Sequence, residues 1–459
     1  MNNPTPQPHD YTDLGNARRL IDRHGRQLRY VHGHGLWRVW DGQRWAVDTT
    51  GEVTRRAIDT VDAIPHELAV LTPGHLKHAG TSQDRSRLTA MIALVRDLEP
   101  VAVSHHAFDA DPWALNTTNG IIDLRTGQLH PHDPDQLHTR LVPATYDPGI
   151  ACPLWERFLE QTIGNPQVIG YVQRLVGYTL TGLSREHVLP VLHGDGANGK
   201  STFLDVLLTL LADYAWTAPS ELLLTTRNDQ HPTALADLQG RRLAVVSETD
   251  QGRRLNEAQV KTLTGGDRIV ARRMRGDFYT FAPSHTLWTA TNHLPQVRGR
   301  DEGIWRRLKP LAFSRRIPDG EKDPRMRDRL CTELDGILAW AVQGCLAWQT
   351  HGLDEPAMVT AGRDAYRNQT DIIGPFLDDC CHLADGQHAY AVDIYTAYQR
   401  WCRTSGESPI SQRELGQHLA RRGLTNKKHG PKRTIAWFGI GLAQDDTSEA
   451  GQTQLRGIA

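Results

Sequence analysis

The chain alternates between apolar runs of strand length and longer stretches with helical spacing. The run "VLPVL" (188–192) precedes a glycine-rich loop, and "FLDVLLTLL" (203–211) follows that loop with the pattern of a buried helix. Two further apolar runs, within 241–248 and 285–292, each end in polar residues. This alternation predicts an α/β fold, with a three-layer core around a mainly parallel sheet. Pro190 interrupts the first run because it cannot donate to a sheet ladder, but the loop and helix that follow still favour a strand there.

Alternating patterns of strand type flank this core. "LWRVWDGQRWAVD" (36–48) and "LNTTNGIIDLRTGQLHPH" (115–132) alternate about Asp-Gly and Asn-Gly turns and predict hairpins. The tryptophans of the first hairpin could stack nucleobases, although packing in a small sheet is favoured. Towards the C-terminus, helices near 390–405 and 411–422 precede an apolar ribbon at 434–442. We therefore predict a Trp-rich hairpin and helical region at 1–150, an α/β domain at 151–350, a small domain of helices and a ribbon at 351–445 and a disordered tail at 446–459.

The stretch "GDGANGKST" fits the phosphate-binding pattern G-x-x-x-x-G-K-[ST] between a predicted strand and helix. Its glycines let backbone N–H groups approach phosphates, and the N-terminus of the helix adds a positive end. Lys200 would reach the β- and γ-phosphates, and Ser201 would hold Mg²⁺. The cofactors predicted are therefore ATP and Mg²⁺, with contacts from Gly194, Asp195, Gly196, Ala197, Asn198, Gly199, Lys200, Ser201 and Thr202.

Polar residues that follow the other two strands complete a hydrolytic site. Glu248 follows "LAVVS" and is the expected carboxylate for Mg²⁺ or the attacking water, and Asn292 follows "TAT" and could bond the γ-phosphate. The alternatives are a surface acid at a strand end and a turn asparagine. The pair Arg306 and Arg307 offers an arginine for the site of a neighbouring subunit, unless both belong to a solvated basic patch. The predicted catalytic residues are Lys200, Glu248, Asn292, Arg306 and Arg307.

The segment between the strand that precedes Glu248 and the strand that precedes Asn292 helps to tell one class of P-loop protein from another. "RIVARRMRGDFYTF" (268–281) alternates about a turn and predicts a β-hairpin, where a small-molecule kinase would need a substrate pocket. Basic groups beside an aromatic ring suit a single nucleic-acid strand, since charges follow the phosphates and rings stack on bases. A charged, exposed hairpin without a ligand is the alternative. The DNA contacts predicted here are Lys261, Arg272, Arg273, Arg275 and Phe278.

Any nucleic-acid contact must come from such local clusters, because the formal net charge of the 459 residues is −1. A second cluster, Lys427, Lys428, Lys432 and Arg433, lies in the C-terminal ribbon beside the helix at 411–423. It would bind duplex DNA with the helix in a groove and the ribbon on the backbone, unless it docks a protein partner or is a solvated loop. The chain shows neither a long apolar run nor a signal-peptide pattern, so a cytoplasmic protein that binds no membrane is expected.

The order of five motifs resembles one known class of enzyme. GDGANGKS, VVSET, KTLTGGDRIVARRMRGDF, LWTATNHLP and GIWRRL together resemble superfamily 3 helicases of the AAA+ class, within the phage and plasmid primase-helicases related to the poxvirus primase-helicase. The resemblance implies that 151–350 is an AAA+ ATPase domain and that 351–445 is a small winged-helix-like domain. It also implies a homo-hexameric ring that threads single-stranded DNA, moves 3′ to 5′ and unwinds forked duplex. ATP would lie between subunits, with the hairpin in the channel. A replication initiator or a separate primase would be the partner, in the cytoplasm of a bacterial host that carries the phage, prophage or plasmid.

One departure from that family concerns priming. The region before residue 150 is short, and the D-x-D of "FDADPW" (108–113) lies next to Pro112, which favours a turn. Primase activity is therefore not expected. The leading prediction is an ATP-dependent DNA helicase, and the alternative is a DNA-dependent P-loop ATPase that acts as a loader or switch without unwinding.

Overall fold

The chain divides into two compact units, Met1–Arg363 and Asp364–Ala459. The computed structural model describes residues 10–67, 72–225, 233–247, 254–273, 276–297, 301–315, 317–318, 320, 322–369, 373–405, 409–431 and 433–443. The domain boundaries predicted at 150, 350 and 445 stay predictions.

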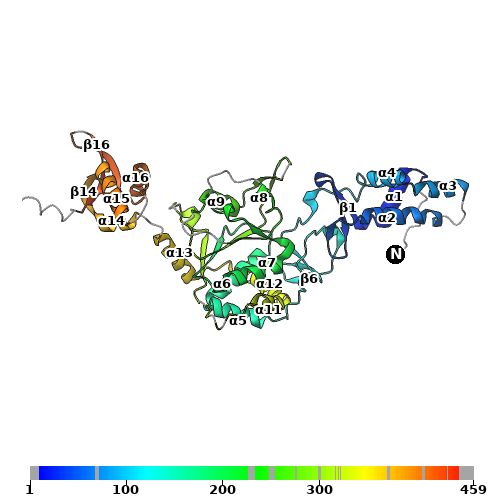
Figure 1. Cartoon of the computed structure of the whole chain (residues 1–459), viewed down its shortest axis with the longest axis horizontal. Coiled ribbons are helices and arrows are strands. Elements are labelled where there is room, and N and C mark those ends of the chain that lie inside the picture. The colour runs from blue at the N-terminus through cyan, green and yellow to red at the C-terminus, as the bar shows by residue number, and fades with distance from the viewer. Residues whose placement is uncertain are drawn as a thin grey trace, which may run out of the picture. The chain divides into compact units, whose positions relative to one another are not determined.

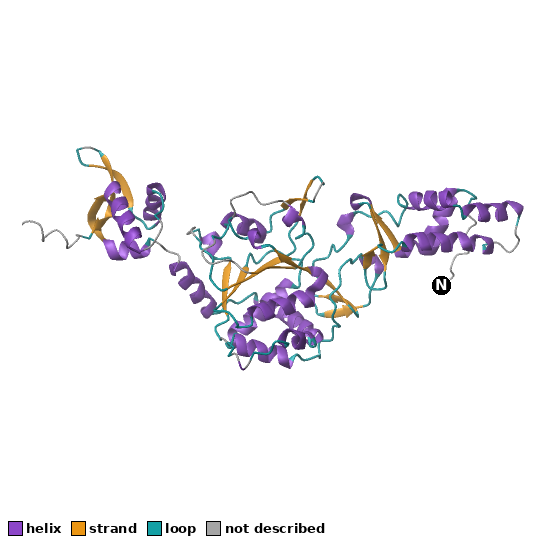
Figure 2. Cartoon of the chain, in the orientation of Figure 1, coloured by secondary structure: helices purple, strands orange, loops and turns teal. Residues whose placement is uncertain are grey.

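The first unit begins with a helical bundle beside a small antiparallel sheet (Figure 2). The bundle consists of α1 (Asp13–His24), α2 (Glu52–Ala63), α3 (Pro73–Ser82) and α4 (Arg85–Val95), and the sheet of β1 (Leu28–Val31), β2 (Leu36–Trp40) and β3 (Trp45–Val47). β2 and β3 form the hairpin predicted at 36–48, with Trp40 opposite Trp45. Trp45 is fully buried and lies under the Arg29 guanidinium, 4.4 Å from the ring centroid, so packing is the role of this tryptophan.

A second antiparallel sheet contains β4 (Ala114–Thr117), β5 (Gly120–Asp123) and β6 (Gln128–His130). It confirms the hairpin predicted at 115–132. Short 3₁₀ turns occur among these elements and after them, at Gly25–Gln27, His32–His34, Ile64–His66, His105–Ala107, Pro134–Gln136, Ala212–Tyr214 and Ser220–Leu222.

The centre of the first unit is a parallel sheet. Its strands are β7 (Leu189–His193), β8 (Ala215–Ala218), β9 (Leu243–Ser247), β12 (Thr286–Thr291) and β13 (Leu308–Ala312), in the order β13-β7-β12-β9-β8 with every pairing parallel. The predicted α/β fold is confirmed. Pro190 pairs with Lys309 of β13, and the ladder between β7 and β12 begins only at the next residue, Val191. β7 therefore tolerates the missing N–H group, because no ladder bond to β12 is due at Pro190.

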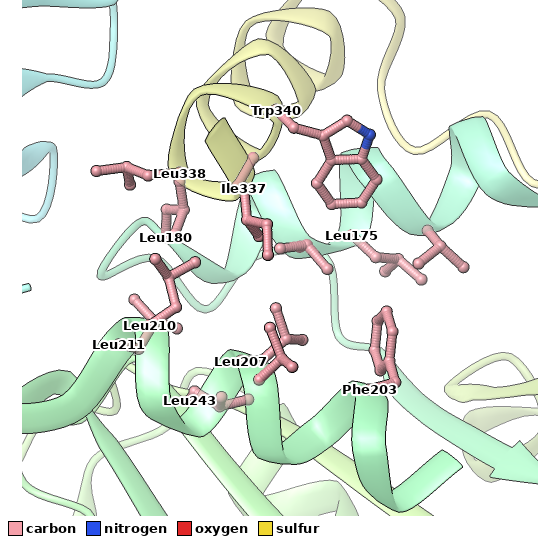
Figure 3. Packing of buried hydrophobic residues seen from close by; sticks show 14 of the residues in the cluster. Leu175, Leu180, Phe203, Leu207, Leu210, Leu211, Leu243, Ile337, Leu338 and Trp340 are labelled. Carbon is pink, nitrogen blue, oxygen red and sulfur yellow. The ribbon is translucent and has the colours of Figure 1, made fainter. Parts of the chain in front are cut away.

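Helices cover both faces of this sheet (Figure 1). One face carries α5 (Pro153–Thr162), α6 (Pro166–Thr179), α7 (Lys200–Leu211), α11 (Met326–Cys331) and α12 (Leu334–His351), and the other carries α8 (Thr233–Ala236) and α9 (Glu257–Thr264). Apolar side chains of α6, α7 and α12 meet above β9 (Figure 3), with Leu175, Leu207 and Ile337 exposed by 1% or less. Each such burial contributes about 1.5–3 kcal/mol, and the layer fixes the helix that follows the glycine-rich loop.

The remaining elements of the first unit project from the sheet or follow it. β10 (Ile269–Arg272) and β11 (Phe278–Phe281) form an antiparallel hairpin, α10 (Glu302–Trp305) precedes β13, and α13 (Ala357–Gln369) spans the division between the units. Among the described residues, no helix has both the length and the apolar character that crossing a membrane requires.

The second unit has the order helix, strand, helix, helix, strand, strand. These elements are α14 (Gly374–Cys380), β14 (Cys381–Tyr390), α15 (Ala391–Ser405), α16 (Gln412–Arg421), β15 (Thr425–His429) and β16 (Thr434–Leu442), with the antiparallel sheet order β14-β16-β15. The helices predicted near 390–405 and 411–422 and the ribbon at 434–442 are confirmed. Phe376, Tyr398 and Trp437 belong to its separate hydrophobic core.

Candidate functional site: two edges of one parallel sheet

The glycine-rich loop, residues 194–199, joins the carboxyl end of β7 to the first turn of α7. Gly194 (φ +146°) and Gly199 (φ +88°) adopt conformations that L side chains rarely take. A Cβ at Gly194 would also lie 2.3 Å from the Phe313 carbonyl oxygen, so this position accepts only glycine. The loop therefore presents main chain rather than side chains in front of the helix N-terminus, as a phosphate-binding loop requires.

Lys200 is held inside this loop. Its Nζ donates to the carbonyl oxygen of Gly194 at 2.6 Å and to Oδ1 of Asn198 at 2.9 Å. The amide of Asn198 in turn donates to the Phe313 carbonyl at 2.8 Å, which ties the loop to the end of β13. Burial lowers the pKa of Lys200, and the nearby carboxylate of Asp195 opposes that shift.

The exposure of the loop leaves room for a nucleotide. Asp195, Gly196 and Ala197 are exposed, and no atom lies within 4 Å of a Cβ built on Gly196. Ser201 is exposed and Thr202 half-buried in the first turn of α7. Main-chain N–H groups, an ammonium group and an exposed hydroxyl together fit a triphosphate with Mg²⁺.

The expected carboxylate and asparagine follow neighbouring strands at this same carboxyl edge. Thr291 of β12 pairs with His193 of β7, and exposed Asn292 follows it directly, so the asparagine lies at the edge that carries the loop. β9 ends at Ser247, one residue before Glu248, and Ser247 pairs with Ala290 of β12. Glu248 itself lies outside the described residues, as do Arg275 and Lys432. No group of three His, Cys, Asp or Glu side chains in the described part of the chain could hold a metal ion.

Arg306 and Arg307 lie at the opposite, amino edge of the sheet. The carbonyl of Arg307 accepts from the amide of Leu189, where β7 begins, and the amide of Phe313 donates to His193, where β7 ends. The strand between these two bonds covers about 15–20 Å. Neither arginine can therefore reach the glycine-rich loop of its own chain.

Arg306 and Arg307 have different surroundings in the structure, although nothing in the sequence assigns them different roles. Arg307 is buried, and it donates from Nε to Oγ1 of Thr264 at 3.0 Å and to the Gly303 carbonyl at 2.6 Å. Burial lowers the pKa of Arg307, and the charge of Arg306 adds to that effect. Arg306 is exposed at the end of α10. Arg307 therefore holds the local structure, and Arg306 is the arginine that solvent or another molecule can reach.

The hairpin of β10 and β11 rises from this amino edge too, since β11 leads within five residues into the start of β12. Its two faces differ sharply. Ile269, Ala271 and Phe281 are buried, whereas Val270 and Phe278 on the other face are 54% and 62% exposed. Arg272 lies opposite Phe278 in the register, with its guanidinium 5.4 Å from the ring centroid. The predicted hairpin is thus confirmed, and its open face combines a cation with an accessible aromatic ring.

The predicted DNA contacts of the first unit differ in their surroundings. Arg273 is exposed beside the turn, and Arg272 donates to the Gly276 carbonyl at 3.0 Å. Lys261 forms an ion pair with Asp301, which also caps the N-terminus of α10 through the amide of Gly303 at 2.7 Å. The Lys261 hydrogen bond lowers the pKa of Asp301. The sequence alone did not single out Asp301, because forty residues separate it from its partner; its capping position ahead of "EGIW" was the only local signal.

Two contacts therefore join α9 to the arginine segment, Lys261 with Asp301 and Thr264 with Arg307. α9 leads directly into the hairpin through residues 265–268. α10, α9 and the base of the hairpin are therefore linked to one another through side-chain contacts and along the chain.

The D-x-D of the N-terminal region has structural partners. Asp109 accepts from Arg140 at 2.9 Å and from the amide of Thr139 at 2.8 Å, and Asp111 pairs with Arg125 at 3.1 Å. Asp109 has a φ of +50°, in agreement with the predicted turn. In the second unit, Lys427 and Lys428 are exposed on β15, and Arg433 is exposed in the turn before β16.

Two segments of the chain match known protein families. Residues 17–164 match the family described as D5 N terminal like. Residues 192–307, which include the glycine-rich loop and the hairpin, match a family of unknown function, DUF5906.

The chain is similar to viral proteins whose names describe them as putative helicases. One from Acanthamoeba polyphaga mimivirus is 25% identical over 353 residues, which cover 71% of this chain and 37% of the relative. Another, from Invertebrate iridescent virus 6, is 21% identical and covers 69% of this chain and 37% of the relative. A third, from Frog virus 3 (isolate Goorha), is 26% identical over half of this chain. The chain thus spans little more than a third of the first two relatives.

A solved structure shares the fold. The A-form apo structure of the NrS-1 C-terminal region superposes with a TM-score of 0.50 at 10% identity, and covers 90% of this chain and 96% of that one. The D5 N terminal match and the similarity to viral proteins named as putative helicases support the coarser part of the predicted resemblance.

Proposed function

We propose that this chain is an ATP-dependent DNA helicase of superfamily 3, with an AAA+ motor that acts as a hexameric ring. The observation that carries the proposal is that the two edges of one sheet hold different functional groups. The carboxyl edge holds the phosphate-binding loop, and the amino edge holds Arg306 and the basic, aromatic hairpin. Because Arg306 cannot reach the loop of its own chain, a second copy must supply the arginine.

The residues of the carboxyl edge would bind the nucleotide. The main chain of residues 194–199 and Lys200 would hold the phosphates, Ser201 with Glu248 would hold Mg²⁺, and Asn292 would orient the attacking water. Bound Mg²⁺ would neutralise charge on the phosphates. For Lys200 this requires exchange of its bonds to Gly194 and Asn198 for bonds to phosphate.

The amino edge would use the energy of hydrolysis. Arg306 would stabilise the charge on the phosphoryl group held by the neighbouring chain, and α10 and α9 would pass its movement to the hairpin. Arg272, Arg273 and Phe278 would hold a single DNA strand in the ring channel. The order of elements and the exposed lysines of the second unit support a winged-helix-like domain that contacts duplex DNA.

The biological setting belongs to the same proposal. Movement from 3′ to 5′, unwinding at a replication fork, and an initiator or separate primase as partner follow from the resemblance in sequence. A role in the bacterial cytoplasm, during replication of a phage, prophage or plasmid, follows from the same resemblance.

The test is ATP hydrolysis with and without single-stranded DNA, together with strand displacement on a forked duplex. We expect hydrolysis that requires Mg²⁺, is stimulated by DNA and is accompanied by displacement. Lys200→Ala should lower hydrolysis by about 10²–10³-fold, since an essential cation at the phosphates is lost. Lys77→Ala, an exposed lysine of α3, is the matched control. Stimulation without displacement would favour a loader or switch, and hydrolysis indifferent to DNA would refute both DNA functions.

A further inference from the structure

The sheet of the second unit has two faces of different chemistry. Successive residues of a strand point to opposite faces, and Trp437 of β16 belongs to the hydrophobic core. Phe438 therefore points away from that core. The strand register places His388 and Thr425 beside Phe438, and Tyr390 and Lys427 beside Ala436, two residues along the same face. The face opposite the core thus carries aromatic rings and a cation.

These side chains contact one another across all three strands. The His388 ring stacks on Phe438 with centroids 5.7 Å apart and an interplanar angle of 19°. His429 lies 5.5 Å from Phe438 and 4.5 Å from His388. Nζ of Lys427 lies 4.4 Å from the centroid of the Phe438 ring. We call His388, Tyr390, Lys427, His429 and Phe438 the outer-face cluster.

The backbone beside Phe438 is shaped by an irregularity in the sheet. The register between β14 and β16 shifts between Leu383 and His388, and Gly439 has a φ of +86°. A Cβ at Gly439 would be strained and would lie 3.0 Å from Cδ2 of Leu424. Such bulges bend a strand and re-aim its side chains, and they often occur next to functional sites. The bulge therefore determines how Phe438 and His388 meet.

The cluster differs from a core in the exposure of its side chains. His388 and Lys427 are exposed, and Tyr390, His429 and Phe438 are half-buried. Of the adjoining residues along the strands, Lys428 and Arg433 are basic and exposed, and Asp385 lies in the bulged stretch of β14. An exposed ring such as that of His388, beside cations, is the chemistry that holds single-stranded nucleic acid, because bases stack and phosphates pair with the cations.

We propose that the outer-face cluster is a binding site for single-stranded DNA, which stacks its bases on the exposed His388 ring that Phe438 supports. A duplex hides the faces of its bases, so it would leave these rings without a ligand. The site shares Lys427 with the duplex contact expected from α16 and the ribbon, but its rings belong to the outer face of the sheet. It does not depend on the proposed ATPase activity, since the binding needs no nucleotide.

Binding of labelled oligothymidylate to the full chain, measured by fluorescence anisotropy without ATP, tests the proposal. The parent protein should carry Arg272→Ala and Phe278→Ala, so that the hairpin of the first unit contributes little. In this background, Phe438→Leu with His388→Ala should weaken binding by about tenfold, while leucine preserves the apolar contact with the sheet. Thermal melting confirms that the variant is folded.

Lys427 and its neighbour Lys428 offer a matched control. Both are exposed and carry the same charge, but the register directs them to opposite faces of β15. Lys427→Ala should weaken single-strand binding several-fold more than Lys428→Ala does. Equal effects of the two lysines, combined with no effect of the ring substitutions, would overturn the proposal in favour of nonspecific attraction. A loss confined to duplex binding would also overturn it.

Photocrosslinking gives a second readout that needs no substitution. An oligonucleotide with 5-iodouracil, irradiated on the wild-type protein, should attach to peptides that contain Phe438, Tyr390 or His388. Attachment to the 269–281 hairpin alone would refute the outer-face site even if the substitutions weaken binding.

Discussion

The carboxyl and amino edges of the central sheet are built in different ways. At the carboxyl edge, Lys200 bonds to Gly194 and Asn198, so the groups of the proposed phosphate site lie within a few consecutive residues. At the amino edge, Arg306 depends on α10, and α10 is fastened to α9 by contacts between residues about forty positions apart. The first edge is built from one short stretch of sequence, and the second from elements that are distant in the sequence. In the proposed helicase, this difference would suit one edge to binding and the other to transmission.

The largest expected effect comes from the exposed arginine. Arg306→Ala should lower ATP hydrolysis by about 10³-fold or more, because a trans-acting arginine stabilises charge on the transferred phosphoryl group. Arg306→Lys should recover little, since a lysine lacks the planar fork of donors. Phosphate release measures both. Arg85→Ala, an exposed arginine of α4, is the control and should retain full activity.

Mixing subunits shows whether the two edges meet between chains. Neither Arg306→Ala nor Lys200→Ala protein should hydrolyse ATP alone, but an equal mixture should contain intact sites at about a quarter of its interfaces. The expected result is recovery of roughly that fraction of the wild-type rate. No recovery on mixing would argue that the arginine does not act on a neighbour's site.

The hairpin should give the next largest effect. Arg272→Ala with Phe278→Ala removes the cation and the exposed ring from the open face, and should weaken single-strand binding by about 10–100-fold. The ratio of hydrolysis rates with and without DNA should fall accordingly. Val270→Ala, on the same open face, removes apolar surface but neither ring nor charge, and should change binding less than twofold or so. If the two variants behave alike, the open face does not hold DNA by stacking.

The difference between the edges also explains what the sequence could predict. The glycine-rich loop is contiguous in the sequence, so spacing alone predicted the roles of Lys200 and Ser201, which stay predictions. Strand periodicity predicted the α/β fold, which the structure confirms. The hairpin was predicted as well, because alternation and a turn are local signals. The roles of Arg306 and Arg307 were not separable, since burial of Arg307 depends on Thr264, a residue of a distant helix. Lys261 was predicted as a DNA contact, and its pairing with Asp301 required the folded chain.

Arg307 should affect stability rather than catalysis. Arg307→Leu loses the bonds to Thr264 and to the Gly303 carbonyl and leaves the buried Thr264 hydroxyl without this donor, which should lower the free energy of unfolding by about 1–3 kcal/mol. Denaturant unfolding measures the change, with Arg306→Leu as the neighbouring control expected to unfold like the wild type. Equal destabilisation of both variants would contradict the separation of the two arginines.

The smallest expected effect concerns the ion pair that links α9 to α10 at the amino edge of the sheet. An exposed ion pair such as Lys261 with Asp301 adds little to stability, yet it joins the arginine segment to the helix that leads into the hairpin. Lys261→Ala and Asp301→Asn should each lower the stimulation of hydrolysis by DNA about twofold, and the double variant should lower it no further. Single-strand affinity separates the two roles of the lysine. If Lys261 holds α10, Asp301→Asn reproduces its loss; if Lys261 binds DNA, only Lys261→Ala weakens binding and reduces its dependence on salt.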